Sequence, residues 1–275
     1  MSRHVKARLL LLLTFGLSVP ASAGDASWQT LNGEAISLCR KGRHAEAIQV
    51  AAKALRVAEE TGGPDHPLAA LSLNNLALLY KNQGQYAKAE PLYQRSIAIK
   101  EKTLGPDHPH VALGLNNLAE LYRIQGRYAE ALQLYNRALE IKEKALGPQD
   151  LSVATSLNNL AALYRAEGHH AAAAEPLYRR ALAIREKVLG SYHPSVATSL
   201  SNLAALYDAQ GRDEEAESSY QRALSIREKI LGPNHPSVVT SLEDLAALYR
   251  KTNRAGAAMP LEMRAAVIRS AQSLP

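Results

Sequence analysis

One short segment recurs along this chain at an almost constant interval, and this recurrence restricts the possible folds more than any other feature. Residues 72–77 read SLNNLA, and related segments follow at intervals of 42, 42, 43 and 42 residues. These copies begin at Gly114, Ser156, Ser199 and Ser241. A weaker first copy lies 42 residues before Asn74, at Asn32. Repetition with a period of about 20 to 50 residues is typical of a stack of similar units, so we expect a repeat fold.

Each unit contains two stretches in which apolar residues have helical spacing. In the unit that holds residues 72–77, the first stripe has offsets of 0, +3, +4 and +7, and the second has offsets of 0, +4, +7 and +8. Such offsets place residues on one face of an α-helix, so each unit is expected to be a helical hairpin. A glycine at the same place in four units suits a left-handed residue at the end of the first helix. The stripes are Leu73, Leu76, Ala77 and Tyr80, then Ala89, Tyr93, Ser96 and Ile97, and the glycines are Gly84, Gly126, Gly168 and Gly211.

Such hairpins need to stack, because one hairpin alone cannot bury its apolar face. We therefore predict an all-α solenoid of about six helix hairpins. The expected mature domain spans residues 24–275, and its terminal units depart from the pattern at Glu34, Ala51, Asn253 and Glu262. The expected repeats are residues 28–63, 68–105, 110–147, 152–190, 195–232 and 237–272.

A short linker joins each unit to the next. In Leu104–Pro109 the glycine stops one helix, and the last proline suits the first position of the next helix. Histidines in these linkers are expected to be turn or cap residues, because packed helices lie about 8 to 10 Å apart whereas zinc ligands lie within about 2.1 Å of the ion. The pair His169–His170 is expected in a solvated turn, and one extra residue before Ala174 is expected to lengthen that turn. The linker histidines are His66, His108, His193 and His235.

The first 23 residues differ from the repeats. Three basic residues precede an apolar run over residues 9–19, and Ala21–Ala23 has an Ala-x-Ala pattern. This order is typical of a secretory signal peptide, with cleavage expected after Ala23. The apolar run is much shorter than the roughly 20 residues that a membrane-spanning helix needs. We expect a protein that is exported across the inner membrane, to a bacterial periplasm, with no stable membrane insertion after cleavage.

Charge and cysteine content exclude further classes of protein. The formal net charge is +6, and the loss of three basic and no acidic groups with residues 1–23 would leave +3. A charge this small gives no support for nucleic-acid binding. Cys39 is the only cysteine, so no internal disulfide can form. We expect Cys39 to be a surface or half-buried thiol of a helix.

Ten positions of the third unit carry a family resemblance. They resemble the complete tetratricopeptide signature, and the long unit with its linker is similar to the repeats of kinesin light chains and their bacterial relatives. The resemblance covers about residues 28–271. It implies a right-handed superhelix whose first helices line a concave groove that binds extended peptides, with no catalysis and no cofactor. The positions are Leu115, Leu118, Ala119, Tyr122, Gly126, Tyr128, Ala131, Tyr135, Ala138 and Leu139.

Two columns of asparagine run along the first helices, on the arc opposite the packed stripe. Asparagine is a mediocre helix former, so its recurrence needs a reason. A carboxamide both donates and accepts, which suits the main chain of an extended peptide, and the resemblance implies the same contact. Alternatively, these side chains bridge adjacent first helices or are solvated. The predicted peptide-binding asparagines are Asn74, Asn75, Asn116, Asn117, Asn158, Asn159 and Asn202.

A third column is mostly basic and would favour an acidic peptide or a carboxyl terminus. Its members also lie near the ends of helices, where basic side chains are favoured by the helix dipole. Small residues between the columns, such as Ala162 and Ala205, would leave room for side chains of a partner. Asp208 interrupts the column, and its basic members are Lys81, Arg123, Arg165 and Arg250.

No pattern in the chain indicates catalysis, since it contains neither a phosphate-binding glycine loop nor a Gly-x-Ser-x-Gly motif. Charged runs that end the second helices, such as Lys100–Lys102 and Arg185–Lys187, are expected on a solvated outer surface, and so is Lys142. The predicted function is therefore non-enzymatic binding of a partner's peptide segment in the groove. The alternative is a self-associating scaffold of the cell envelope that uses the convex face or the ends of the stack.

Overall fold

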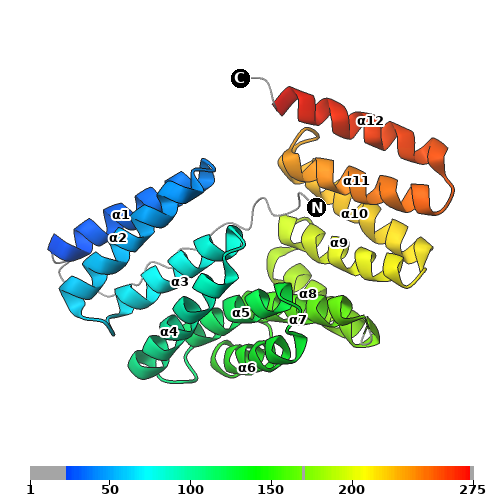
Figure 1. The fold of residues 1–275 in the computed structure, drawn as a ribbon. Coiled ribbons are helices and arrows are strands. Elements are labelled where there is room, and N and C mark those ends of the chain that lie inside the picture. The colour runs from blue at the N-terminus through cyan, green and yellow to red at the C-terminus, as the bar shows by residue number, and fades with distance from the viewer. Residues whose placement is uncertain (1–22, 169–170, 273–275) are drawn as a thin grey trace. The chain divides into compact units, whose positions relative to one another are not determined.

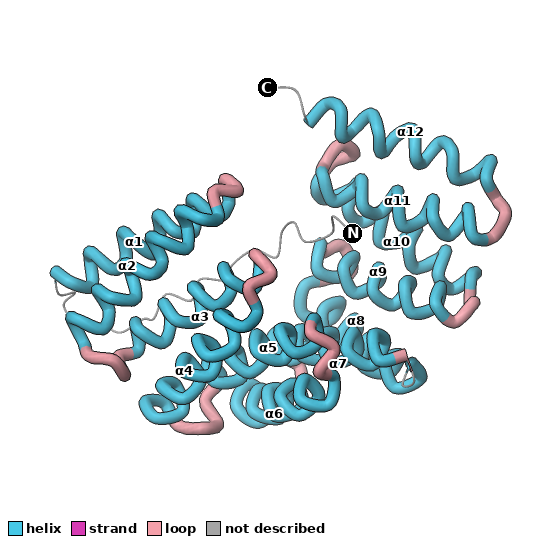
Figure 2. Tube along the Cα trace, in the orientation of Figure 1, coloured by secondary structure: helices cyan, strands magenta, loops and turns pink. Residues whose placement is uncertain are grey.

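The computed structural model describes residues 23–168 and 171–272. These residues form twelve helices and no strand (Figure 1), which confirms the all-α prediction. Short turns join the helices (Figure 2). The helices are α1 (Ala23–Arg40), α2 (His44–Gly62), α3 (Pro67–Asn82), α4 (Tyr86–Leu104), α5 (Pro109–Ile124), α6 (Tyr128–Leu146), α7 (Leu151–Glu167), α8 (Ala171–Leu189), α9 (Pro194–Ala209), α10 (Asp213–Leu231), α11 (Pro236–Lys251) and α12 (Ala255–Gln272).

Contacts between helices divide the chain into two compact units, one up to Ile141 and one from Lys142 onward. We call the odd-numbered helices first helices and the even-numbered helices second helices. In the first unit α1 packs on α2 and α3 on α4, while α2 also packs on α3 and α4 on α5. In the second unit α7 pairs with α8, α9 with α10 and α11 with α12, and α8 and α10 also pack on the hairpins that follow them. This consecutive pairing confirms the solenoid of about six hairpins.

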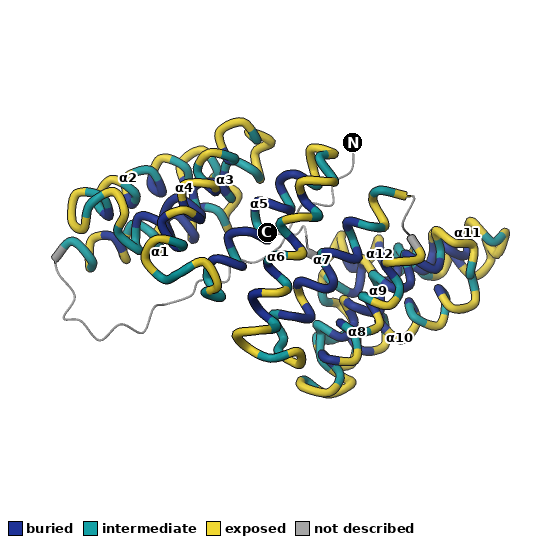
Figure 3. The backbone as a smooth tube through the Cα atoms, turned by 90° about the horizontal axis from the view of Figure 1, so that it is seen from below, coloured by how far each residue is buried: buried dark blue, intermediate teal, exposed yellow. Residues whose placement is uncertain are grey.

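The predicted apolar stripes form the core of each unit (Figure 3). Ala77 of α3 and Tyr93 of α4 are fully buried in the first unit, as is Tyr178 of α8 in the second. Because the chain has only one Phe and one Trp, tyrosines of the second helices are the largest side chains of the core. Trp28 of α1 is also buried, and its Nε1 donates to Ser72 Oγ at 2.7 Å.

The linker histidines cap the helices that follow them. The backbone N–H of Leu68 donates to His66 Nδ1 at 3.3 Å. Asp150 replaces histidine in the fourth hairpin, where its Oδ1 accepts from the backbone N–H of Ser152 at 2.7 Å. Each contact satisfies one N–H that would otherwise lack a partner at a helix start, so the cap interpretation is confirmed. The histidine contact recurs at His108, His193 and His235, with N···N distances of 3.2, 3.1 and 3.1 Å.

The first helices end at the predicted left-handed glycines. Gly84 has a φ of +70°, and its N–H donates to the carbonyl of Lys81 at 3.0 Å. The N–H of Gln85 donates to the carbonyl of Tyr80 at 2.9 Å. Together these bonds form a Schellman motif, which satisfies carbonyls left open at a helix end. Asn253 occupies the glycine position of the last hairpin with a φ of +59°, because asparagine tolerates this conformation better than most residues.

The extra residue of the fourth hairpin lengthens a helix and not its turn. α7 has 17 residues, whereas α5 and α9 have 16. Three positions separate α7 from α8, as they separate α5 from α6. The predicted longer turn is therefore wrong, because the residue continues the hydrogen-bond pattern of α7 and needs no new turn geometry. Ala174 and Tyr178 stay buried, as predicted.

Ion pairs join successive second helices. In each pair an arginine contacts a glutamate of the preceding second helix, so several glutamates of the charged runs are tied to a neighbour. Each pair is partly solvated and contributes about 0 to 1 kcal/mol. The pairs are Arg95–Glu59, Arg137–Glu101, Arg180–Glu143 and Arg222–Glu186, with N···O distances of 2.7, 2.6, 2.6 and 2.5 Å, and Arg264–Glu228.

Two predicted features fall outside the described residues. The expected signal peptide, residues 1–23, lies there except for Ala23, which is the first residue of α1. The pair His169–His170 lies there as well. Among the helices that the structure describes, none has the length and apolar character to cross a bilayer.

Candidate peptide-binding face

One face of the first helices carries the predicted asparagines, and we call it the Asn face. It is defined in the first unit by Asn75 of α3 and Asn117 of α5, and in the second unit by Asn159 of α7 and Asn202 of α9. All four side chains are half-buried. Each lies next to the buried stripe of its helix and not within it, since neighbouring residues are about 100° apart around a helix.

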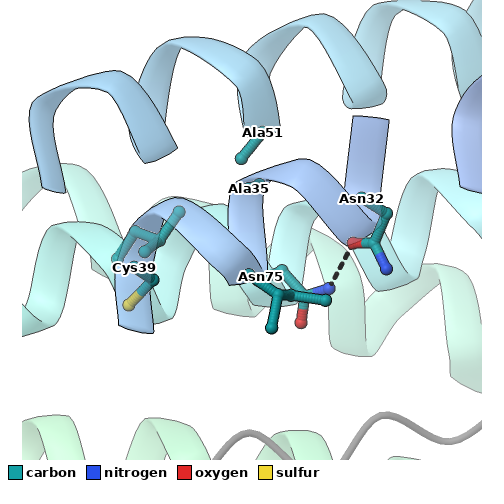
Figure 4. A pocket seen from close by; sticks show the side chains of 7 residues that line it. Asn32, Ala35, Cys39, Ala51 and Asn75 are labelled. Atoms are coloured by element: carbon teal, nitrogen blue, oxygen red, sulfur yellow. Dashed lines mark hydrogen bonds between the residues drawn. The ribbon is translucent and has the colours of Figure 1, made fainter. Parts of the chain in front are cut away.

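Side-chain hydrogen bonds join neighbouring first helices at the Asn face of the first unit. Asn75 Nδ2 donates to Asn32 Oδ1 of α1 at 2.9 Å (Figure 4). Asn117 Nδ2 donates to Asn74 Oδ1 of α3, also at 2.9 Å. Each bridge uses one N–H of the amide, and the Oδ1 atoms of Asn75 and Asn117 accept no hydrogen bond from any described residue. The amides are thus held in one orientation with an acceptor left over.

The first asparagine of each pair is buried. Asn74, Asn116 and Asn158 are 9%, 5% and 4% exposed. Asn116 Nδ2 donates to the carbonyl of Ala112 at 3.0 Å, within its own helix. Little of these side chains is left for a ligand, and Asn74 acts by holding its neighbour Asn117 in place.

The second unit arranges its asparagines differently. Ser201 occupies the first asparagine position of α9, and its Oγ accepts from Arg227 Nη1 at 3.1 Å. The buried Oδ1 of Asn158 has no hydrogen-bond partner in the part of the chain that the structure describes. Asn202 likewise makes no hydrogen bond with a described residue, so both groups of its half-exposed amide are available.

Two arginines of the basic column are already neutralised by carboxylates. Arg123 makes a two-fold contact with Glu120, with N···O distances of 2.8 and 2.9 Å. These hydrogen bonds to Glu120 raise the pKa of Arg123. Arg250 contacts Glu262 in the same manner at 2.9 and 2.6 Å. The column therefore attracts anions less strongly than its composition suggests.

The other members of the basic column vary. Lys81 is half-buried near the end of α3. Asp208, which interrupts the column, accepts an ion pair from Lys251 at 2.7 Å. Arg165 is exposed and forms no ion pair with a described residue, so it is the member most open to an incoming anion.

A second set of cations is buried, contrary to the sequence prediction. Lys100 of α4, Lys142 of α6 and Arg185 of α8 are 5%, 6% and 8% exposed. Lys142 Nζ donates to Ser156 Oγ at 2.8 Å, and Arg185 Nη1 donates to Ser199 Oγ at 2.5 Å. Each of these two cations reaches from a second helix to a serine of the next first helix. The expectation of a solvated outer surface for these residues is therefore wrong.

Arg227 of α10 extends this set, which we call the buried cation column. Its guanidinium contacts Ser241 of α11 as well as Ser201 of α9. Since Ser201 stands at the first asparagine position, Arg227 reaches the layer directly beneath the Asn face. The partners of Lys142 and Arg227 in these bonds are neutral hydroxyl and carbonyl oxygens, which leave the positive charge uncancelled.

Lys100 lacks the serine partner that Lys142 has. Gly114 stands at that position, and Lys100 Nζ lies 3.8 Å from where a Cβ of residue 114 would be. The side chain of Ile97 fills the space of the missing hydroxymethyl group, with Cγ1 2.7 Å from the same point. Burial lowers the pKa of both Lys100 and Lys142 to about 8.

A small hollow opens beside the bridge of Asn75 (Figure 4). It is lined from α1, α2 and α3, and its volume of about 10 Å³ admits about one water molecule. Cys39, at its edge, is the half-buried thiol that the sequence predicted, and burial raises its pKa. A thiol with a raised pKa is not an activated nucleophile. The described residues include no group of three or more potential metal ligands.

Paired helices with left-handed ends and polar bridges along one face define a helical-repeat interaction protein. The family model of the tetratricopeptide repeat matches residues 29–102, 73–144, 110–177, 172–229 and 210–269. The chain belongs to the tetratricopeptide repeat family. Proteins of this family are in general protein–protein interaction modules without catalytic activity, and they offer extended surfaces to a partner.

Solved structures confirm the predicted kinesin-light-chain-like type. A putative kinesin light chain with nearly identical TPR-like repeats, from Podospora anserina, is 31% identical, with a TM-score of 0.64 over 76% of this chain and 99% of that chain. BtubC (BKLC) from P. vanneervenii is 23% identical, with a TM-score of 0.66 over 91% and 92%. PilF from Pseudomonas aeruginosa is 18% identical, with a TM-score of 0.57 over 87% and 90%. The last two similarities show the fold alone, and no curated protein matches this chain.

Proposed function

We propose that this protein holds an extended peptide segment of a partner protein against its Asn face, in the groove of the solenoid, without catalysis. The observation that carries the proposal is the orientation of Asn75 and Asn117. Their Nδ2 atoms are held by bridges to the preceding first helix, while their Oδ1 atoms remain open. Two acceptors on successive repeats are thereby oriented before any ligand arrives.

Acceptors of this kind suit the main chain of a peptide. Every residue except proline carries a backbone N–H, so an amide oxygen can accept from a peptide of almost any sequence. An extended peptide leaves these groups unpaired and accessible along its edge. Because Asn75 and Asn117 are already ordered by their bridges, less side-chain entropy is lost when they bind.

The buried cation column supports a preference for acidic peptides. Lys142 and Arg227 donate to neutral oxygens, so their charges act on the adjoining face with less screening than solvated charges would. Arg165 adds an exposed guanidinium to the second unit. The small side chains Ala162 and Ala205 are partly exposed there and leave room for side chains of the peptide.

We further propose that this binding takes place after export, in a bacterial periplasm. The proposal rests on the basic head, the short apolar run and the Ala-x-Ala pattern of residues 1–23. The partner would then be a protein of the cell envelope.

Two matched variants test the peptide-binding proposal. The probe is a fluorescein-labelled peptide selected on the wild-type protein from a random phage-displayed library. Asn117→Ala and Asn74→Ala break the same hydrogen bond from its two ends, so each should cost about 1 kcal/mol of stability. Only Asn117→Ala also removes the open Oδ1. We expect it to weaken binding about tenfold or more, and Asn74→Ala to weaken binding less than about threefold.

The control for general charge effects must lie away from the Asn face. Lys142→Glu cannot serve, because Lys142 is buried against Ser156. Lys187→Glu can, since Lys187 is exposed at the end of α8. Equal losses of binding in the two asparagine variants, or a peptide that only Lys187→Glu displaces, would contradict binding by the Asn face.

A further inference from the structure

The outward side of the last helix, α12, is apolar. Met259, Met263 and Val267 are 55%, 63% and 66% exposed. They are four residues apart and therefore lie along one side of the helix. Gly256 and Ala266, both exposed, extend this side without adding charge. We call these five residues the α12 stripe.

The same side of earlier second helices is where the next hairpin stacks. Glu217 of α10 occupies the position of Met259, and it accepts a hydrogen bond from the Tyr249 hydroxyl of α11 at 2.8 Å. Gln221 occupies the position of Met263, and it donates to the same hydroxyl at 3.2 Å. In α12 these polar groups are replaced by methionines, so the stripe cannot receive another hairpin of this kind. In the first unit the same contacts are made by Glu90, Gln94 and Tyr122.

The charged side chains of α12 are all engaged within the chain. Glu262 pairs with Arg250 of α11, with an N···O distance of 2.6 Å. Arg264 pairs with Glu228, and Arg269 pairs with Glu243. The stripe is therefore uncharged, and an identical stripe would meet no electrostatic repulsion there.

The first helix, α1, presents a polar side by contrast. Its exposed residues are polar, charged or small, and none that the structure describes is a large apolar residue. Terminal repeats need a polar outer face to stay soluble, and α1 meets that need whereas α12 does not. Stacking of α12 on α1 of a second copy would bury Met263 against Glu34 or Arg40, which carries a desolvation cost. Such head-to-tail contacts would also leave both ends open and generate filaments.

We propose that the protein forms a symmetric dimer in which two copies pair antiparallel through the α12 stripe. Two identical uncharged stripes complement each other about a two-fold axis, and the dimer closes because both stripes are used. The antiparallel direction also pairs the helix dipoles favourably. Met263 lies near the middle of α12, so the two copies of Met263 meet at the axis. One helix against one helix is a small interface, so the dissociation constant is on the order of micromolar.

Light scattering of the purified full chain over a range of micromolar concentrations tests this proposal. The mass of the wild type should rise from monomer to dimer and then stop. Met259→Glu with Met263→Glu should remain monomeric over the same range, because four like charges would meet at the axis. Its circular dichroism should not change, since both methionines are exposed. Val188→Glu, which alters a comparably exposed residue of α8, should dimerise as the wild type does.

Oxidative cross-linking in a Cys39→Ser background tests the direction of pairing. Met263→Cys should form a disulfide dimer. Gly256→Cys should not, because the two copies of residue 256 would lie about 21 Å apart in the antiparallel pair, beyond the roughly 7 Å that a disulfide spans. A side chain at residue 256 has open space, so the control should fold normally.

Three results would overturn the proposal. One is a wild type that stays monomeric at every concentration, including one whose stripe binds zwitterionic lipid vesicles instead. Another is growth of the mass beyond a dimer, which would indicate head-to-tail contacts. The third is cross-linking of Gly256→Cys as fast as Met263→Cys, which would indicate a different geometry.

Discussion

Replacing Lys100 with methionine removes a buried positive charge and keeps the length of the side chain. Lys100 is 5% exposed and faces Gly114, which has no hydroxyl to accept from it. Burial lowers its pKa to about 8, from an ordinary value of 10.5. Since one pKa unit corresponds to about 1.4 kcal/mol, the charged form costs the folded protein about 3 kcal/mol at pH 7. We expect Lys100→Met to raise the free energy of unfolding by about this amount.

This gain should shrink as the pH is raised. The folded protein loses the Lys100 proton near pH 8, whereas the unfolded chain keeps it to about pH 10.5. Between these values the unfolded chain binds more protons, so the wild type becomes more stable as the pH rises. At pH 10 the advantage of Lys100→Met should therefore be about 2 to 3 kcal/mol smaller than at pH 7. Lys142 is present in both proteins, and its titration cancels in the comparison.

Urea titrations at pH 7 and pH 10, followed by circular dichroism, measure this difference. Lys102→Met is the matched control, because Lys102 lies two residues away and is exposed. It should change the free energy of unfolding by less than about 0.5 kcal/mol at pH 7. A Lys100→Met variant that is less stable than the wild type at pH 7, or equally stabilised at both pH values, would refute the reasoning.

Three further predictions concern the register, the caps and export. Tyr135→Ala should cost about 3 to 5 kcal/mol in a urea titration, because Tyr135 is fully buried. Glu262→Ala, at the equivalent place in the last hairpin, should cost less than about 1 kcal/mol, and equal effects would contradict the register. His193→Ala should cost about 1 kcal/mol of stability by loss of the cap, whereas His193→Asp should not, and equal losses would exclude the cap as the cause. Mass spectrometry of the protein from an exporting host should find Gly24 as the first residue, and an intact amino terminus would argue against export.

The hairpins could be predicted from the sequence because their signals act locally. Apolar spacing defines each helix within one unit, Gly84 ends a helix by its own φ, and His66 caps the next helix two residues away. The extra residue of the fourth hairpin was misplaced because helix and turn can absorb it with the same spacing afterwards. Nothing in the pattern distinguishes these outcomes.

The roles of polar residues were harder to predict, since their burial depends on how closely neighbouring first helices approach. Asn74 and Asn75 are adjacent in sequence, yet Asn74 is buried and Asn75 keeps an open acceptor. Lys100 belongs to a charged run that is typical of solvent-exposed helix ends. One signal was available: in three hairpins a basic residue is followed 14 positions later by the serine that it contacts. These pairs are Lys142–Ser156, Arg185–Ser199 and Arg227–Ser241.

The central claim is that the Asn face holds the main chain of a peptide, and a crystal structure with the selected peptide tests it most directly. We predict a peptide N–H with its nitrogen about 2.7 to 3.2 Å from the Oδ1 atom of Asn75, and another at the same distance from that of Asn117. The bridges to Asn32 and Asn74 should remain intact in the complex. A peptide bound along the second helices, or one whose main chain lies away from both asparagines, would contradict the account.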